Sequence, residues 1–317
     1  MDRRGFLRGL ASAPLVGWAC ARPGAQAPGV THRLLAQDRG RVAVIDADGS
    51  VDWSWENGAG AHDLHLLPSG NLLVPTARDR IVELTSEKEV VWEWQSEPAG
   101  EDVDRVEIHA FERLESGLTM VAETGNRRIV EVDREGGIQH EIPLQVDNPH
   151  WHHDTRLVRL TPDGTYLVAH ESDGAVREYD RDGKVVWEYS LELTGPETPT
   201  HRGHGTDVYS AYRLQGGNTL IGGGNNNRVL EVDSGGEIVW SLDSGDIPGI
   251  RLFWVTQLQA LPNGNVVVTN THAEGETPQI FEVTRDKDLV WGFLDWETFG
   301  NDLCANILLD VEGHVIR

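Results

Sequence analysis

Short runs of alternating apolar and polar residues fill most of the chain, and turn residues separate them. One hairpin pattern occurs six times, with a glycine between two alternating runs in each copy, as in HLLPSGNLLV (65–74). A glycine at this place is typical of a tight turn that joins two strands. The six glycines recur at intervals of 47 to 53 residues, at Gly70, Gly117, Gly164, Gly217, Gly264 and Gly313. Intervals of this length predict the four-stranded blades of a β-propeller.

The two ends of the chain each carry part of one repeat. A second pattern of strand, polar turn and strand follows each hairpin, as in RVLEVDSGGEIVWSLD (228–243), and residues 41–56 carry it with no inner strand ahead of it. Residues 304–317 supply an inner strand with no outer strands behind it. We therefore expect an all-β, six-bladed propeller over residues 32–317. Pairing of the N- and C-terminal strands would close it and remove the exposed sheet edges.

Tryptophans recur at one point of the outermost strand, where a large flat side chain is expected to pack at each blade junction. They are Trp53, Trp92, Trp187, Trp240 and Trp291, and Gln139 breaks the series. The segments GEIVW and GKVVWEY, after EVD or EYD, resemble the tryptophan-bearing blades of quinoprotein-like (PQQ-like) propellers. The resemblance implies a blade type and not PQQ binding, because PQQ dehydrogenases of that kind have eight blades and this chain has no vicinal cysteine pair.

The first 21 residues predict an export signal rather than part of the fold. Arg3 and Arg4 precede a short apolar run, the pattern of a Tat-type signal, and the run from Leu10 to Ala21 is too short for a permanent transmembrane helix. We expect a signal peptide (1–21), a linker (22–31), the Tat translocase as partner during export, and a periplasmic or extracellular protein. Cleavage after a small-x-small site and lipidation of Cys20 are both compatible with the sequence.

Charge narrows the class of partner. The chain has 27 Lys and Arg residues against 51 Asp and Glu residues, a formal net charge of −24. Nucleic acid and anionic membrane surfaces favour clustered positive charge, so neither is expected as a partner. A small molecule is the better expectation. Only two cysteines are present, Cys20 and Cys304, so no structural disulfide is expected in the mature monomer.

Most of the 13 histidines are expected on one face of the propeller, because the loop that enters the innermost strand and the loop that follows the second strand lie together there. Imidazoles and guanidiniums at one channel mouth indicate a small anionic molecule or a metal ion. The residues expected to bind substrate there are His62, His152, Arg128, Arg228, Trp151 and Trp254.

The segment His153-Asp154-Thr155-Arg156, followed by LTPDGTYLV, resembles the HDAR strand of bacterial arylsulfate sulfotransferases, which are exported six-bladed propellers. In those enzymes a channel histidine takes the sulfuryl group and passes it to a phenol. The resemblance implies an aryl sulfate as the anionic substrate and no cofactor. It also implies a catalytic set in which Asp154 orients an imidazole, made of His153, His109, His204 and Asp154.

The site resemblance is partial. HAFE, around His109, lacks the Asn-Ser of that family, a W-R-L-G-G segment is replaced, and the chain is about half the usual length without the dimerising domain. From the residues we expect the imidazoles at 150–153 to start an inner strand, with His153 facing His109 and His204 and with Arg156 more peripheral.

Two other function classes stay open. A metal-dependent hydrolase or lactonase would hold a divalent ion on the propeller axis, and a histidine-rich set favours a transition metal. Its candidate ligands are His62, Asp63, His109, His153, Asp154 and His204. A non-catalytic propeller would instead recognise a glycan or a protein through Trp151 and Trp254.

Overall fold

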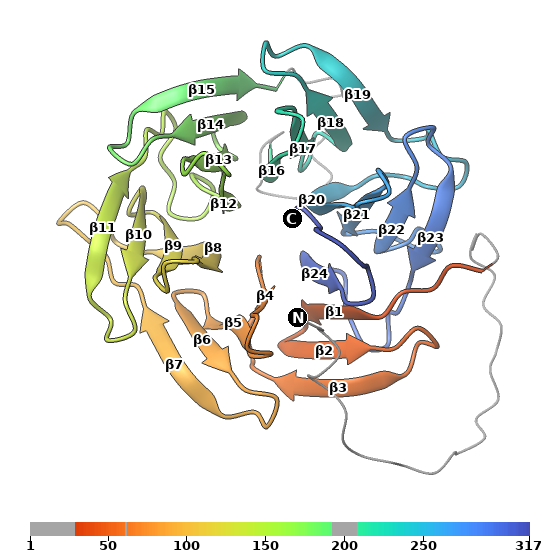
Figure 1. Cartoon of the computed structure of the whole chain (residues 1–317), viewed down its shortest axis with the longest axis horizontal. Coiled ribbons are helices and arrows are strands. Elements are labelled where there is room, and N and C mark those ends of the chain that lie inside the picture. Colours follow the sequence, from red (N-terminus) through yellow and green to blue (C-terminus); the bar gives the residue numbers. More distant parts are fainter. Residues whose placement is uncertain (1–28, 61, 192–207) are drawn as a thin grey trace.

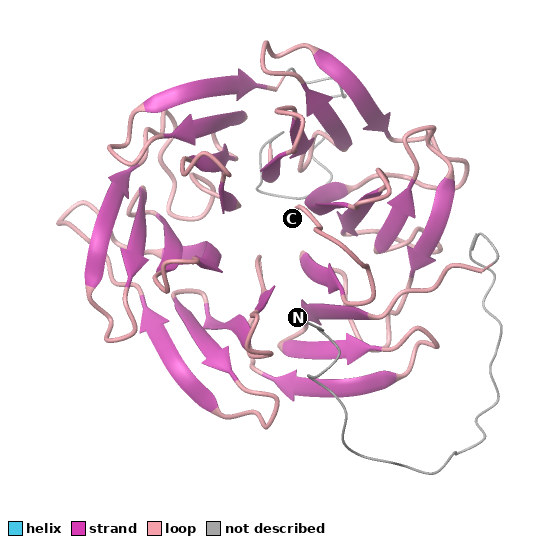
Figure 2. Cartoon of the chain, in the orientation of Figure 1, coloured by secondary structure: helices cyan, strands magenta, loops and turns pink. Residues whose placement is uncertain are grey.

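The computed structural model describes residues 29–60, 62–191 and 208–317, so the expected signal peptide lies outside the described residues. Within these ranges the chain forms six antiparallel four-stranded sheets, arranged as a ring around a central axis (Figure 1). We use the word channel for the region that the innermost strands surround. The described residues contain strands, loops and turns, and none of them forms a helix able to cross a membrane (Figure 2). The prediction of an all-β, six-bladed propeller is confirmed.

Five blades are built from consecutive strands, which follow one another from the axis outward. Blade 1 contains β4 (His65–Leu66), β5 (Leu72–Ala77), β6 (Arg80–Leu84) and β7 (Val90–Gln95). Blade 2 contains β8 (Glu107–Arg113), β9 (Thr119–Thr124), β10 (Arg128–Val132) and β11 (Ile138–Pro143). Blade 3 contains β12 (Val158–Leu160), β13 (Tyr166–His170), β14 (Ala175–Tyr179) and β15 (Val185–Ser190).

The remaining blades complete the ring. Blade 4 contains β16 (Ser210–Arg213), β17 (Thr219–Gly222), β18 (Arg228–Val232) and β19 (Ile238–Asp243). Blade 5 contains β20 (Trp254–Ala260), β21 (Val266–Thr271), β22 (Ile280–Val283) and β23 (Leu289–Phe293). The closing blade takes β24 (Ala305–Leu308) from the C-terminal region, and β1 (Leu34–Asp38), β2 (Arg41–Ile45) and β3 (Val51–Glu56) from the N-terminal region.

Ring closure depends on the pairing of β24 with β1, in which Leu34 lies opposite Leu308. The expected strand pairing of the two chain ends is therefore confirmed. The prediction of a hairpin around Gly313 is wrong, because no strand follows β24 in this blade. The place of its second strand is taken by β1, and the chain after β24 leaves the blade. It forms a bridge between Ile316 and Ala260 of β20 and ends near the centre of the ring (Figure 1).

The other five repeat glycines form the expected turns between the first two strands of their blades. Gly70 has a φ of 90° and its N–H donates to the main-chain oxygen of Leu67. This conformation is open to glycine and costs free energy for other residues. The same positive φ is found at Gly117, Gly164, Gly217 and Gly264. A tight turn at this point lets the second strand return directly to the channel face.

A buried carboxylate joins each of blades 1 to 5 to the next blade. It lies in the third strand and pairs with a cation of the following blade, as Glu178 does with Arg213 at 2.5 Å. The equivalent carboxylates are Glu83, Glu131, Glu178, Glu231 and Glu282, all buried. Their partners from the next blade are Arg113, Arg181, Arg213, Arg285 and His32, respectively. These pairs hold neighbouring blades in register.

The repeat tryptophan packs at the same seam. The guanidinium of Arg213 lies 4.9 Å from the ring centre of Trp187, and that of Arg285 lies 4.9 Å from Trp240. A cation–π contact of this kind contributes about 0.5–2 kcal/mol, which adds to the ion pair made by the same arginine. The expected packing role of these tryptophans is confirmed.

Blade 2 is the exception in the tryptophan series, and the residue that replaces tryptophan is His140. Opposite the seam carboxylate, other blades place tryptophan, as Trp92 lies opposite Glu83. In blade 2 the residue opposite Glu131 is His140, so the assignment of this position to Gln139 was wrong. A bulge between β10 and β11 shifts the register by one residue there.

We expect a pH-dependent contribution to stability from His32, which bridges Glu282 and Asp310 at the closing seam. Burial alone would lower the pKa of His32, but hydrogen bonds and charges from Asp310 and Glu282 outweigh burial and raise it to about 9. Because this pKa is above the unfolded value of about 6.5, the stabilisation is complete below pH 6.5 and is lost as the pH rises through 9.

Wild-type protein should therefore lose about 1–2 kcal/mol of unfolding free energy across this window, allowing for solvent screening. His32→Ala should remove most of the dependence, as measured by urea unfolding at several pH values. The exposed His314 offers a control, because His314→Ala should keep the wild-type dependence. Parallel pH curves for wild type and His32→Ala would contradict the assignment.

Candidate functional site

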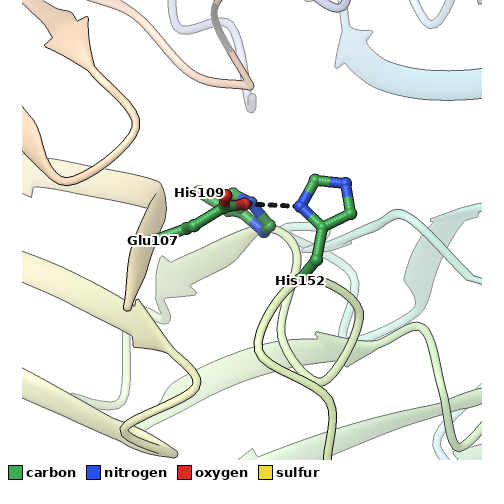
Figure 3. A group of neighbouring side chains, drawn as sticks. All are labelled: Glu107, His109 and His152. Atoms are coloured by element: carbon green, nitrogen blue, oxygen red, sulfur yellow. Dashed lines mark hydrogen bonds and ion pairs between the residues drawn. The ribbon is translucent and has the colours of Figure 1, made fainter. Parts of the chain in front are cut away.

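Glu107 and His109 lie at one end of the channel and come from the first strand of blade 2. The register of β8 against β9 shifts between Ile108 and Ala110, which makes His109 a bulge. A bulge re-aims a side chain, and in β8 it brings Nε2 of His109 to 3.1 Å from Oε2 of Glu107. His152, from the loop before blade 3, places Nδ1 2.5 Å from the same oxygen (Figure 3). We call these three residues the Glu107 cluster.

Glu107 is the centre of this group. Its other carboxylate oxygen accepts hydrogen bonds from Arg78 at 2.8 Å and pairs with Arg105 at 2.9 Å. Burial alone would raise the pKa of Glu107, but polar contacts with His109, His152 and Arg78 outweigh burial and hold it well below its usual range. The carboxylate is therefore charged at neutral pH.

His109 has hydrogen-bond acceptors near both ring nitrogens. Its Nδ1 lies 2.9 Å from the main-chain oxygen of Thr155, and Nε2 faces the Glu107 carboxylate. Burial, together with the charge of Arg156, lowers its pKa to about 4, so the ring is neutral at pH 7 and carries one proton. We assign that proton to Nδ1 from the short contact with Thr155. The lone pair of Nε2 then points toward Glu107 and His152.

His62 and Tyr209 complete the wall next to the cluster. The His62 ring centre lies 4.3 Å from that of His109, and Nδ1 of His62 lies 2.7 Å from the Tyr209 hydroxyl. Burial lowers the pKa of His62 well below its usual value and raises that of Tyr209 well above its own. Both groups are therefore neutral at pH 7.

Arg156 lies next to the rings of His109 and Tyr209, so the prediction that it is peripheral is wrong. It is fully buried and pairs with Glu171. Its guanidinium lies 5.6 Å from the ring centres of both Tyr209 and Trp254, and Nη1 lies 3.5 Å from Nδ1 of His109. The positive charge of Arg156 is one reason why the imidazoles remain neutral.

The imidazoles at 150–153 form a turn, and the expectation that they start an inner strand was wrong. The N–H of His153 donates to the main-chain oxygen of His150 at 3.2 Å, and β12 begins only at Val158. The turn stacks the His153 ring on His150, with centres 4.2 Å apart, and leaves His152 to meet His109. His204 lies outside the described residues.

Neither Asp154 nor Asp63 contacts an imidazole of the Glu107 cluster. Asp154 accepts hydrogen bonds from a main-chain N–H, and Asp63 pairs with an arginine. The Asp154 carboxylate accepts from the N–H of Gly125 at 3.2 and 3.3 Å, and burial raises its pKa to about 6. A Cβ at Gly125 would lie 2.3 Å from the main-chain oxygen of Arg105. This contact packs the loop that carries Arg105 directly against blade 2.

Asp63 closes the channel below the cluster. Its two oxygens lie 2.8 and 2.9 Å from the guanidinium of Arg159, and one accepts from Gln257 at 3.1 Å. Burial alone would raise the pKa of Asp63, but Arg159 and His65 outweigh burial and hold it well below its usual range. We call Asp63, Arg159 and Gln257 the channel plug.

The remaining predicted binding residues are dispersed. Arg128 pairs with Glu123 and Glu141, and Arg228 pairs with Asp243. Trp254 is buried and stacks on His272, with ring centres 5.0 Å apart. Trp151 alone lies exposed at the rim, where the Arg105 guanidinium covers its ring at 3.9 Å.

The sequence reasoning missed Glu107, Arg105 and Tyr209. Glu107 lies two residues before His109 in the sequence, but strand alternation does not predict their contact, because the bulge at His109 interrupts the alternation. No local pattern marks Arg105 or Tyr209. Both reach the site through loops whose course depends on the neighbouring blades.

The Glu107 cluster has the composition and spacing of a metal site. One ligand atom from each of its three residues lies within 4.8 Å of the other two. A ligating histidine commonly donates its other ring N–H to a main-chain carbonyl, as His109 does to Thr155. Two imidazoles and a carboxylate suit a divalent transition metal.

We expect His109 to stay neutral, as the Nδ1–H tautomer, from pH 8 down to about pH 5 in metal-free protein, because its pKa is lowered to about 4. Nitrogen-15 NMR of histidine-labelled protein distinguishes the tautomers, and His109→Gln identifies the signal. A titration midpoint above pH 6, or a proton on Nε2, would contradict this geometry.

Comparison with known proteins places the fold in a family. A family model described as outer membrane protein assembly factor BamB, of PQQ-like repeats, matches residues 38–290. A solved protein of unknown function from Bacteroides caccae is 22% identical, covers 87% of this chain and 98% of its own, and has a TM-score of 0.73. Streptogramin B lyase is 15% identical, with 86% of each chain covered and a TM-score of 0.56.

A further similar structure is a catalytically inactive histidine-to-alanine variant of virginiamycin B lyase from Staphylococcus aureus with quinupristin. It is 13% identical, covers 87% of this chain and 89% of its own, and has a TM-score of 0.55. No curated protein matches the sequence. The structural similarity to these proteins shows the same propeller fold. The family model matches most of the chain. The chain belongs to the PQQ-like β-propeller family described as outer membrane protein assembly factor BamB.

Proposed function

We propose that this propeller binds a divalent transition metal ion at Glu107, His109 and His152, and acts on a small anionic substrate in a hydrolase- or lyase-type reaction. The observation that carries the proposal is the His109 ring. Its Nδ1 is held by Thr155, so the lone pair on Nε2 is aimed at the carboxylate and the second imidazole. In metal-free protein that arrangement leaves a nitrogen lone pair against a carboxylate. A cation between them would remove this repulsion.

A metal ion held there would supply Lewis-acid polarisation of a substrate oxygen. The protein's own groups determine which substrate approaches. Arg78 and Arg105 lie at the rim with exposed side chains and pair with the inner carboxylate, so their remaining N–H groups face solvent. Guanidiniums at this place favour an anionic substrate group. Trp151 adds a flat apolar surface beside Arg105.

His62 and Tyr209 are the groups that can move a proton. Tyr209 stays protonated because its pKa is raised, and its hydroxyl is hydrogen-bonded to Nδ1 of His62 at 2.7 Å. Nε2 of His62 makes no hydrogen bond with any described residue. A neutral imidazole beside the cluster suits general acid–base chemistry. Among the propellers of similar fold, virginiamycin B lyase also requires a histidine, because its histidine-to-alanine variant is catalytically inactive.

Sulfuryl transfer through a histidine is the second candidate, favoured by the guanidiniums beside the imidazoles. The nucleophile needs a ring nitrogen with an available lone pair. His109 offers one at Nε2 in metal-free protein, whereas the His153 ring is stacked on His150, with its centre 5.0 Å from that of His152. Under this candidate, His109 and an aryl sulfate would take the roles that the arylsulfate sulfotransferase resemblance implies.

Export through the Tat translocase remains part of the proposal. The twin arginines Arg3 and Arg4 support a periplasmic or extracellular location, with Cys20 as a candidate lipidation site. These residues lie outside the described part of the chain. Fractionation of cells that express wild type or an Arg3→Lys, Arg4→Lys variant tests the location.

Metal binding is tested on untagged protein lacking residues 1–21, by mass spectrometry of bound metals and by calorimetry with Zn²⁺, Mn²⁺ and Ni²⁺. Wild type should bind about one ion. His109→Ala and His152→Ala should weaken binding by at least about tenfold, because each removes a ligand. His153→Ala is the matched control next in sequence and should bind as wild type.

Equal loss in His152→Ala and His153→Ala, or no metal bound to wild type, would contradict the metal proposal. The same proteins are then assayed with p-nitrophenyl sulfate and a phenol acceptor in the presence of EDTA. Turnover that survives EDTA and is lost in His109→Ala would favour sulfuryl transfer instead.

A further inference from the structure

A cavity of the described residues lies at the end of the channel opposite the Glu107 cluster. It has a volume of about 800 Å³, within the range of small-molecule sites. The turns between the first and second strands of blades 2, 3 and 4 form its rim, through Ser116, Pro162 and Gln215. Because a strand carries its two ends to opposite faces, this rim lies away from the loops that carry Arg105 and His152. We call this cavity the distal pocket.

The distal pocket extends into the seam between blades 2 and 3 because tryptophan is missing there. Its lining includes Glu131, Arg181 and Leu167, which are seam residues, together with His140. At the equivalent point of the neighbouring blades a tryptophan fills the seam, as Trp92 does in blade 1. His140 is smaller and exposed, so the groove remains open.

Several polar atoms at the inner end of the pocket have unused hydrogen-bonding capacity. Nε2 of His65, a buried side chain, makes no hydrogen bond, although it lies 3.3 Å from the Asp63 carboxylate. Oε2 of Glu112 and Nε of Arg113 are also buried without a hydrogen-bond partner. A buried polar group left in this state costs about 1–3 kcal/mol. A ligand carboxylate could recover part of this cost at the donors, such as Nε of Arg113, whereas the Glu112 oxygen requires a donor group.

Arg317 is a cation of the pocket that forms no ion pair with a described residue, and the charges of Asp63 and Glu112 act on it from a longer distance. Its guanidinium has a single long contact, 3.4 Å to the main-chain oxygen of Leu64, and forms no ion pair with any described residue. Burial and the charge of Arg159 lower its pKa to about 10, so it is still charged at pH 7. The charge of Arg159 itself is already matched by Asp63 in the channel plug.

We propose that the distal pocket is a second ligand site, for a small molecule with a carboxylate group and an apolar body. The carboxylate would accept hydrogen bonds from Arg317 and His65 near the axis. The apolar body would lie along the aliphatic side chains of the lining toward His140, which are Leu114, Leu118, Leu160, Leu167 and Val315. Arginine is suited to bind a carboxylate with two parallel hydrogen bonds.

This proposal is independent of the metal proposal, because the two sites share no residue. Asp63 and Arg159 are joined by two hydrogen bonds across the channel, and Gln257 closes the same layer. None of the Glu107 cluster residues lines the distal pocket. Either site can therefore fail its test without affecting the other.

The test uses octanoate as the probe. Its binding to untagged protein is measured by calorimetry and by saturation-transfer NMR. Wild type should bind octanoate, and bind 1-octanol at least about tenfold more weakly, because the alcohol lacks the charge. Arg317→Gln should weaken octanoate binding by at least about tenfold, which corresponds to about 1.4 kcal/mol. Inorganic phosphate is included to separate recognition of a carboxylate from general anion binding.

Substitution of His140 provides a matched pair of variants at the other end of the pocket. His140→Trp introduces the residue that other blades carry at this position, so it should fold and should block the groove. It should lose octanoate binding, whereas His140→Ala should keep it within about twofold. Metal binding at the Glu107 cluster should be the same in all four proteins.

Three results would overturn the proposal. One is the absence of octanoate binding to wild type. Another is unchanged binding in both Arg317→Gln and His140→Trp. The third is equal binding of octanoate and 1-octanol, or a preference for phosphate, which would refute the ligand class. Thermal melting of each variant shows whether a loss of binding reflects unfolding.

Discussion

The ion pair between a buried glutamate and a cation of the next blade is the interaction on which the ring depends. A buried carboxylate without a partner is costly, so each of the five seam glutamates requires its neighbour in place. Where an arginine is the partner, as Arg213 is at Glu178, it also lies over the repeat tryptophan and couples charge pairing to packing. At the closing seam His32 takes the place of arginine, so the charge pairing of this seam is lost as the pH rises through about 9.

The channel is divided by a second buried pair. Asp63 and Arg159 join blades 1 and 3 across the axis, and Gln257 reaches them from blade 5. This layer gives the protein two separate ends with different chemistry. One has imidazoles around a charged carboxylate, and the other has an arginine and aliphatic side chains around a larger cavity. A rigid ring with short strands near the axis can present both without a change in its core.

Local backbone features determine which side chains meet at the Glu107 cluster. The bulge in β8 turns His109 toward Glu107, and the tight turn at 150–153 presents His152 instead of His153. Gly125 allows the Arg105 loop to approach blade 2 closely, since a side chain there would collide with it. Small irregularities in otherwise regular blades therefore position the side chains of the Glu107 cluster.

The sequence by itself determined the blade count and the closure by both chain ends, because these follow from strand periodicity and repeat length. The assignment of Gln139 to the blade 2 seam was an error of alignment, since His140 follows Glu131 at the same spacing in the sequence as Trp92 follows Glu83. The site itself was decided by tertiary structure. Glu107, His152 and Tyr209 come from three different blades or loops, and their contacts depend on how the blades pack. Local patterns report a residue's own strand, whereas a channel site is formed by groups that are distant in sequence.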